Sequence, residues 1–213
     1  MNKYNMDLQF GVPINVQTLV MYYLADTFAG EADADGNGTP DVLETYNALY
    51  AYSKEVRKAS TNDNPVFGYV QSLNNEYFNF GYLLSYGAYI FGETTSDIGL
   101  AAGESYKGLQ VMQDLASIMD SDASDDSYTV QAYNGLASGK YRATITTPDV
   151  YVKFYNSLVD KYVKTDKMTQ EAAEAKAAEN LKVSDVPRLP KSGDLTETIT
   201  DVETQTFATT MMG

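Results

Sequence analysis

The sequence predicts an α/β fold, because short β-rich segments alternate along the chain with longer segments of helical periodicity. Segments 66–70 and 141–146 are short and apolar, as buried strands are, and each lies between stretches with helical spacing. Hydrophobic residues make up 44% of the 213 residues, which is enough for a sizeable core. We therefore expect one large or two small globular domains.

The amino-terminal part combines a β-rich segment with a helix. Segment 8–23 is β-rich and contains Pro13, which belongs at the start or the edge of a strand because proline has no backbone N–H. The first helix is expected over residues 41–59, where apolar side chains recur at helical spacing. Basic side chains gather towards its carboxyl end, where positive charge suits the helix dipole.

Further helices follow from apolar periodicity, and a change of composition marks the last part of the chain. These helices are expected over residues 76–91, 105–120, 128–138 and 152–178, the last in two pieces broken near Thr165 and Asp166. From Leu181 onward, prolines and a Thr-rich alternation favour extended chain and short strands.

An acidic loop fills every diagnostic position of a calcium-binding loop. Oxygen ligands at alternate positions would wrap a hard cation, and Gly38 permits the sharp turn. An ordinary surface turn is the alternative, because Asp, Asn and Gly are common turn residues. We expect a structural calcium ion, away from any ligand cleft. Its expected ligands are Asp33, Asp35, Asn37, Thr39, Asp41 and Glu44.

The composition excludes several classes of function. With a formal net charge of −14, nucleic-acid binding is not expected, because phosphates would be repelled. The chain has no His or Cys, so it cannot by itself build a Ser-His-Asp triad or a Cys/His zinc site. No segment reaches the ~18–20 apolar residues of a membrane span. The first residues lack the basic start and apolar run of a signal peptide, so we expect any export signal to lie outside this chain.

Two segments, 74–92 and 135–151, carry a resemblance to a known family. The first reads NNEYFNFGYLLSYGAYIFG and the second GLASGKYRATITTPDVY. Together they resemble the paired motifs that face the sugar-binding cleft of extracellular solute-binding proteins, the maltose- and oligosaccharide-binding type of ABC importers. The matching positions are Tyr77, Phe78, Gly87 and Tyr89 in the first segment, and Gly139, Lys140, Ala143, Ile145 and Pro148 in the second.

The resemblance implies one lobe of a two-lobed periplasmic-binding-protein-like fold, with a central mixed sheet flanked by helices. Residues 1–181 would form the second, ligand-binding lobe, including the first segment that crosses between the lobes. Residues 182–213, with Pro187 and Pro190, would form the return crossing and partial strands of the first lobe. The first lobe would then be a missing partner, and the chain a fragment of the whole binding protein.

The resemblance also implies recognition of an oligosaccharide for an ABC importer, by hinge closure of two lobes over the ligand. An ABC permease would be a further partner, and the chain would act outside the cell, attached to its surface and at most peripheral to the membrane. Sugar sites need flat apolar faces with polar rims. Tyr77 is the expected stacking side chain, with Tyr151 as a further aromatic residue, and the expected polar contacts are Asn75, Glu76, Gln17 and Asp149.

Other functions stay open at this point. Asp149 stands where the family often has a Trp, and this departure, with the missing lobe and signal, favours a structural or surface-assembly protein that keeps a calcium-stabilised lobe. A glycoside hydrolase would need two acids at catalytic separation, and Glu76 with Asp149 is the pair to test. Because paired acids in a sugar cleft also serve plain hydroxyl binding, an enzyme is not expected. Most of the tyrosines are expected to be half-buried surface or core residues.

Overall fold

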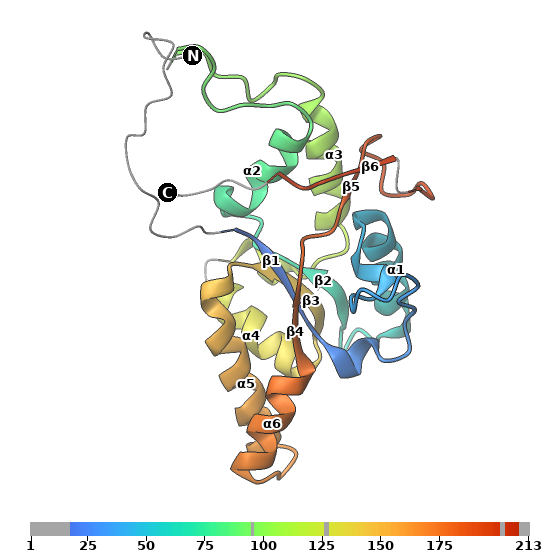
Figure 1. Cartoon of the computed structure of the whole chain (residues 1–213), viewed down its shortest axis with the longest axis vertical. Helices are drawn as coiled ribbons and strands as arrows, with labels where there is room; N and C mark the ends of the chain where they lie inside the picture. Colours follow the sequence, from blue (N-terminus) through green and yellow to red (C-terminus); the bar gives the residue numbers. More distant parts are fainter. Residues whose placement is uncertain (1–17, 95, 126–127, 201–202, 209–213) are drawn as a thin grey trace.

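The computed structural model describes residues 18–94, 96–125, 128–200 and 203–208. At its centre is a four-stranded mixed sheet in the order β2-β3-β1-β4 (Figure 1). β2 and β3 run parallel, whereas β1 is antiparallel to both β3 and β4. The strands are β1 (Val20–Leu24), β2 (Phe67–Val70), β3 (Tyr141–Thr146) and β4 (Leu181–Ser184).

Distant parts of the chain meet at β1. Met21 pairs with Ile145 of β3 on one side and with Ser184 of β4 on the other. All of β1 except its first residue is buried, so both faces of the strand are covered, as in sheets with helices on both sides. β4 begins at Leu181, the last residue of the predicted lobe 1–181, and pairs there with Leu24.

Helices cover the sheet and extend beyond it. α4, α5 and α6 pack on one another in sequence, α1 packs against β2, and α2 packs against α3. Figure 1 shows α4, α5 and α6 gathered to one side, α1 on the opposite side, and α2 with α3 towards the top of the view. None of the described helices combines the length and the apolar character needed to cross a membrane. The helices are α1 (Tyr46–Ala59), α2 (Glu76–Ser85), α3 (Ser105–Ala116), α4 (Tyr128–Ser138), α5 (Tyr151–Lys164) and α6 (Gln170–Asn180).

Short elements connect these larger ones. The chain after β4 is extended, as predicted, and forms a two-stranded ribbon in which β5 (Leu189–Pro190) is antiparallel to β6 (Thr204–Gln205). The hydroxyl of Tyr86 donates to the carbonyl of Pro190, which ties the chain after α2 to this ribbon. The 3₁₀ turns are η1 (Ala25–Phe28), η2 (Asp41–Leu43), η3 (Ser121–Ser124) and η4 (Pro148–Val150).

Several predicted elements are confirmed. α4 and β3 have the predicted boundaries, and the predicted break near Thr165 and Asp166 separates α5 from α6. β1 lies at the end of the predicted β-rich segment 8–23. The earlier part of that segment, with Pro13, lies outside the described residues.

Two predicted helix boundaries are wrong. The helix predicted from residue 41 begins at Tyr46, because the side chain of Thr45 caps it by accepting a hydrogen bond from the N–H of Ala48 at 3.2 Å. The helix predicted to residue 91 ends at Ser85. Gly87 then takes a left-handed conformation (φ 95°), and the chain that follows turns back.

The helix predicted over residues 105–120 is also shorter, because α3 ends at Ala116. Asp120, the last residue of the predicted helix, instead begins the next turn. Its carboxylate accepts a hydrogen bond from the N–H of Asp122, which caps η3. A short polar side chain of this kind favours a cap over a helix interior.

Gly108 lies where α3 crosses α2, and a methyl group there would collide with the backbone carbonyl of Tyr82. We predict that Gly108→Ala lowers the free energy of unfolding by about 2 kcal/mol, as overpacking of a close contact does. This loss exceeds the gain of up to about 1 kcal/mol that Ala brings to a helix. Urea denaturation measures the change. Gly30→Ala, at a glycine with open space around it, is the control. Equal stability of the two variants would contradict this packing.

Candidate ligand-binding site

The amino end of α2 holds three of the predicted ligand-binding residues. Asn75 precedes the helix, and its Oδ1 accepts a hydrogen bond from the N–H of Tyr77 at 2.9 Å. Asn75 and Glu76 are exposed, whereas Tyr77 is half-buried, with its ring edge-on to Phe78 at 5.8 Å between centroids. This turn therefore presents a carboxylate and part of an aromatic ring to solvent.

The turn after β3 holds two more predicted residues. Asp149 lies in η4 and is exposed, and Tyr151 begins α5 and is half-buried. The hydroxyl of Tyr22, from β1, lies 3.1 Å from the carbonyl oxygen of Thr147 and 3.3 Å from that of Pro148. The central strand thus holds the turn that carries Asp149.

Aromatic rings from three elements meet beside this turn. Tyr22 stacks on Phe154 of α5, with 4.6 Å between centroids, and its ring lies 6.4 Å from that of Tyr151. Tyr133 of α4 meets Phe154 edge-on at 4.8 Å. Tyr22, Phe154 and Tyr133 are buried, so these rings form an aromatic core behind the turn, and Tyr151 is the member that is partly exposed.

The negative charge of Asp149 acts on Tyr77 as well as on Tyr22 and Tyr133. Burial raises the pKa of Tyr22, of Tyr77 and of Tyr133, and the negative charge of Asp149 raises each of these values further. All three tyrosines are therefore within range of the charge of Asp149, and Tyr22 also contacts the backbone of the turn that carries it. The fold therefore brings together residues from the two segments that carry the family resemblance.

Sequence analysis did not single out Tyr22 and Tyr133. The hydroxyl of Tyr133 is buried and has no hydrogen-bond partner among the described residues, and the whole residue is 7% exposed. On α4, Tyr133 sits next to Ala132 and one turn before Leu136 and Ala137, which are all buried. Helical spacing therefore marks it as a core residue and contains no signal of a site.

Two further predictions concern Gln17 and the pair Glu76 and Asp149. Gln17 lies outside the described part of the chain. Glu76 and Asp149, the pair considered for hydrolysis, are both exposed, the first at the start of α2 and the second in η4. Acid–base chemistry by this pair stays a hypothesis.

A buried amide fixes the position of the first turn of α2. The Nδ2 of Asn79 lies 2.8 Å from the carbonyl oxygen of Asn75, 3.0 Å from that of Leu73 and 3.3 Å from that of Ser72. Its Oδ1 accepts a hydrogen bond from Nε2 of Gln71 at 3.0 Å. The residue that caps α2 is thereby tied to the chain that leaves β2.

The acidic loop is closed by its own hydrogen bonds. The carboxylate of Asp33 accepts from the N–H groups of Asn37 and Gly38, at 3.1 and 3.0 Å. Nδ2 of Asn37 donates to Asp35 at 2.9 Å and to Glu44 at 2.6 Å. Gly38 has a φ of 87°, which glycine adopts readily. The predicted turn is therefore formed.

The oxygen atoms of this loop are engaged in hydrogen bonds within the loop. Thr39 donates its N–H to Oδ1 of Asn37 at 2.7 Å, and Asp41 accepts from the N–H of Ala34 at 3.0 Å. In the described part of the chain, no three Asp or Glu side chains lie close enough together to hold a metal ion. The amide of Asn37 bridges Asp35 and Glu44, two carboxylates that the motif would direct onto calcium. Calcium binding therefore stays a prediction.

A comparison with protein families covers most of the chain. A profile of the bacterial extracellular solute-binding protein family matches residues 1–192. The chain belongs to this family. A comparison with curated protein sequences gives no match.

Solved structures of solute-binding proteins share the fold. The maltose-binding protein MalE of Listeria monocytogenes, solved with maltose, is 23% identical, with a TM-score of 0.57 over 83% of this chain and 40% of that one. MalX of Streptococcus pneumoniae, solved with maltopentaose, is 21% identical, with a TM-score of 0.59 over 87% of this chain and 42% of that one. The GacH receptor of Streptomyces glaucescens, solved unliganded and with acarbose, is 20% identical, with a TM-score of 0.58 over 84% and 39%.

These matches confirm the predicted family resemblance and the predicted α/β fold of one lobe. The chain spans between 39% and 42% of the length of the neighbouring structures, so it corresponds to a part of the two-lobed solute-binding proteins. At these identities the likeness is one of fold. The roles of the individual site residues stay predictions.

Asn79→Ala removes the amide that ties the first turn of α2 to β2. It leaves Gln71 and several buried carbonyl groups without their partner. Because unsatisfied buried polar groups are costly, we expect the free energy of unfolding to fall by about 2–3 kcal/mol, as measured by urea denaturation. Asn156→Ala, at an exposed position of α5, is the control. A loss no larger than that of the control would show that this amide does not hold the turn.

Proposed function

We propose that this chain is the carbohydrate-binding lobe of a solute-binding protein and recognises an oligosaccharide for an ABC importer. Its membership of the solute-binding family supports this role. The neighbouring structures were solved with maltose, maltopentaose and acarbose, which supports an oligosaccharide as the ligand. The role is one of binding, without turnover of the sugar.

The observation that carries the proposal is the grouping of tyrosines around Asp149. Tyr77 comes from the first resembling segment, Asp149 from the second, and Tyr22 and Tyr133 from β1 and α4. Tyr22 and Tyr133 are buried and support this edge from within the core, whereas the half-buried Tyr77 and Tyr151 can offer a sugar apolar contact beside a carboxylate that accepts hydrogen bonds. In this proposal Tyr77 stacks on a sugar ring, and Asn75, Glu76 and Asp149 bind hydroxyl groups at the rim. Tyr151 and Gln17 are further contacts.

The proposed mechanism needs a second lobe. A ligand held by one lobe is open to solvent on its other side, so closure of the first lobe over it would add contacts and exclude water. We therefore propose that the first lobe and an ABC permease are partners, and that the protein works outside the cell, attached to the cell surface. The isolated lobe is expected to bind sugar weakly.

A second candidate is a surface-assembly protein that keeps this lobe without transport. Its support is a set of large apolar side chains that are more than half exposed on α3 and on the loop before it. Exposed apolar residues that lie together mark interaction surfaces in many proteins. They are Phe91, Ile98, Tyr106 and Leu109, with exposed fractions of 63%, 60%, 64% and 54%.

Tyr77→Ala tests the sugar-binding proposal. Stacking on an aromatic ring contributes on the order of 1 kcal/mol beyond simple burial, so the dissociation constant for maltodextrin should rise by about fivefold. Isothermal titration calorimetry measures it, and Tyr106→Ala, at an exposed tyrosine of α3, is the control. Equal affinity of the two variants would exclude Tyr77 as a contact. Self-association in sedimentation experiments, without sugar affinity, would favour the assembly role.

We also propose that the acidic loop binds a structural calcium ion, with the six predicted residues as ligands. Calcium would replace the amide bridge of Asn37 between Asp35 and Glu44. The support is the full set of motif positions, together with a backbone turn already closed on Asp33.

Millimolar calcium should therefore raise the melting temperature, because a ligand that binds only the folded state stabilises it; at a concentration about 100 times the dissociation constant the gain is about 2.7 kcal/mol. Asp33→Asn keeps an oxygen acceptor for the turn and removes one ligand charge, so it should abolish most of the shift. Asp63→Asn, at an exposed site outside the loop, should keep it. No shift of the unsubstituted chain in a calcium titration would contradict the proposal.

A further inference from the structure

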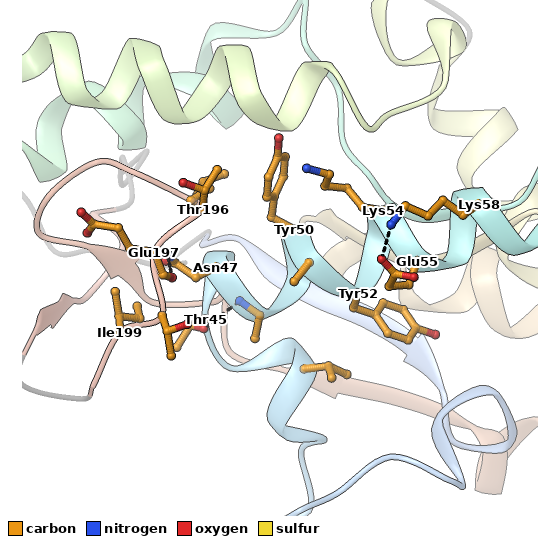
Figure 2. A pocket seen from close by; sticks show the side chains of 15 residues that line it. Thr45, Asn47, Tyr50, Tyr52, Lys54, Glu55, Lys58, Thr196, Glu197 and Ile199 are labelled. Atoms are coloured by element: carbon orange, nitrogen blue, oxygen red, sulfur yellow. Dashed lines mark hydrogen bonds and ion pairs between the residues drawn. The ribbon is translucent and has the colours of Figure 1, made fainter.

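A groove lies along one side of α1, away from the tyrosines around Asp149. A cavity of about 690 Å³ opens between α1 and residues 195–199 (Figure 2). A second cavity, of about 740 Å³, continues along α1 towards the carboxyl end of α3. The two share Tyr50, Lys54 and Lys58, so they meet on the same stretch of helix. Their volumes lie in the range of about 300–1,000 Å³ that is typical of small-molecule sites.

The helical repeat places the lining side chains on one face. Asn47, Tyr50, Lys54 and Lys58 are three or four residues apart and therefore line up along α1. Across the groove, Leu195 and Ile199 supply apolar contacts. Figure 2 shows Tyr50 and Lys54 projecting from the same side of the helix. A flat ring and a flexible cation are thus neighbours at the point where the cavities meet.

Within the described residues, Lys54 forms no ion pair with a carboxylate. Its Nζ lies 5.0 Å from the centre of the Tyr50 ring. Lys58 is different, because it pairs with Glu55 at 2.6 Å. Arg57, which lines the second cavity, donates to the neutral side chains of Ser60 and Asn62.

This part of α1 is therefore locally positive on a chain with a net charge of −14. The remaining acidic side chain of the first cavity, Glu197, lies at the opposite end of the groove from Lys54 (Figure 2). The groove thus has a positive end beside an aromatic ring. An anion is favoured at that end by the local charge, and an apolar ring is favoured by Tyr50.

We propose that this groove binds a small amphipathic organic anion. The acidic group of the ligand is held by Lys54, and its ring packs against Tyr50. The size of the cavity fits a single small molecule. This site is separate from the proposed sugar site and does not depend on sugar binding.

Two fluorescent probes test the proposal. Anilinonaphthalene sulfonate carries a ring system and an anionic group, and N-phenylnaphthylamine carries the same rings without the charge. Because contacts to a charged group are worth about one power of ten in affinity, Lys54→Glu should weaken binding of the sulfonate by about tenfold or more. It should leave binding of the neutral amine unchanged. Tyr50→Ala should weaken binding of both probes.

Lys164→Glu is the matched control, since Lys164 is exposed on α5 and the substitution changes the net charge by the same amount. It should leave the affinity for both probes unchanged. Equal sulfonate affinity of Lys54→Glu and Lys164→Glu would overturn the proposal. An equal loss of affinity for both probes in Lys54→Glu would also overturn the proposal, because the groove would then not recognise charge. Thermal melting of each variant confirms that it is folded before titration.

Discussion

The buried side chain of Gln71 joins three elements of the lobe through hydrogen bonds. Its Oε1 accepts from Tyr69 on β2 and lies 3.0 Å from the hydroxyl of Tyr82 on α2. The same Tyr82 hydroxyl lies 3.0 Å from that of Tyr46 on α1. Burial raises the pKa of Tyr82 to about 12, which moves it further above physiological pH, and the hydroxyl is protonated there. Because polar groups buried without partners are costly, these elements can pack in few other ways.

This network determines where the proposed sugar site lies. Gln71 continues through Asn79 to the backbone at Asn75, the residue that caps α2. On the other side of the site, Tyr22 holds the turn that carries Asp149. Residues that face the proposed ligand are therefore positioned by buried groups that do not touch it. Such support is what keeps a binding site in one geometry.

The lobe has two surfaces with different chemistry. The half-buried Tyr77 and Tyr151 near the exposed Asp149 combine aromatic rings with a negative charge, which suits a neutral, hydroxyl-rich ligand. The groove along α1 combines a ring with Lys54, which has no ion pair in the part of the chain that the structure describes, and this combination suits an anion. Because the two surfaces come from different elements, one could change without disturbing the other. The chain spans about two fifths of the length of its structural neighbours, and in the proposed function its sugar surface would form one wall of a cleft.

Much of the secondary structure could be predicted from local patterns. The boundaries of α4 and β3 and the break between α5 and α6 followed from periodicity, which reflects burial within one element. The end of α2 did not, because Gly87 and the pairing of Tyr89 with Gly99 involve chain beyond the helix. The start of α1 depended on a single cap at Thr45, a feature that periodicity does not contain.

The sequence by itself determined the fold class, the family and two of the segments that contribute to the proposed site, since these depend on residue order and on short motifs. Only the tertiary structure decided that Tyr22 and Tyr133 join Tyr77 near Asp149, and that Lys54 faces a groove without a carboxylate partner. The reason is physical. Burial, charge and hydrogen bonding at these positions depend on side chains that are distant in the sequence, and pairing at β1 brings those parts of the chain together.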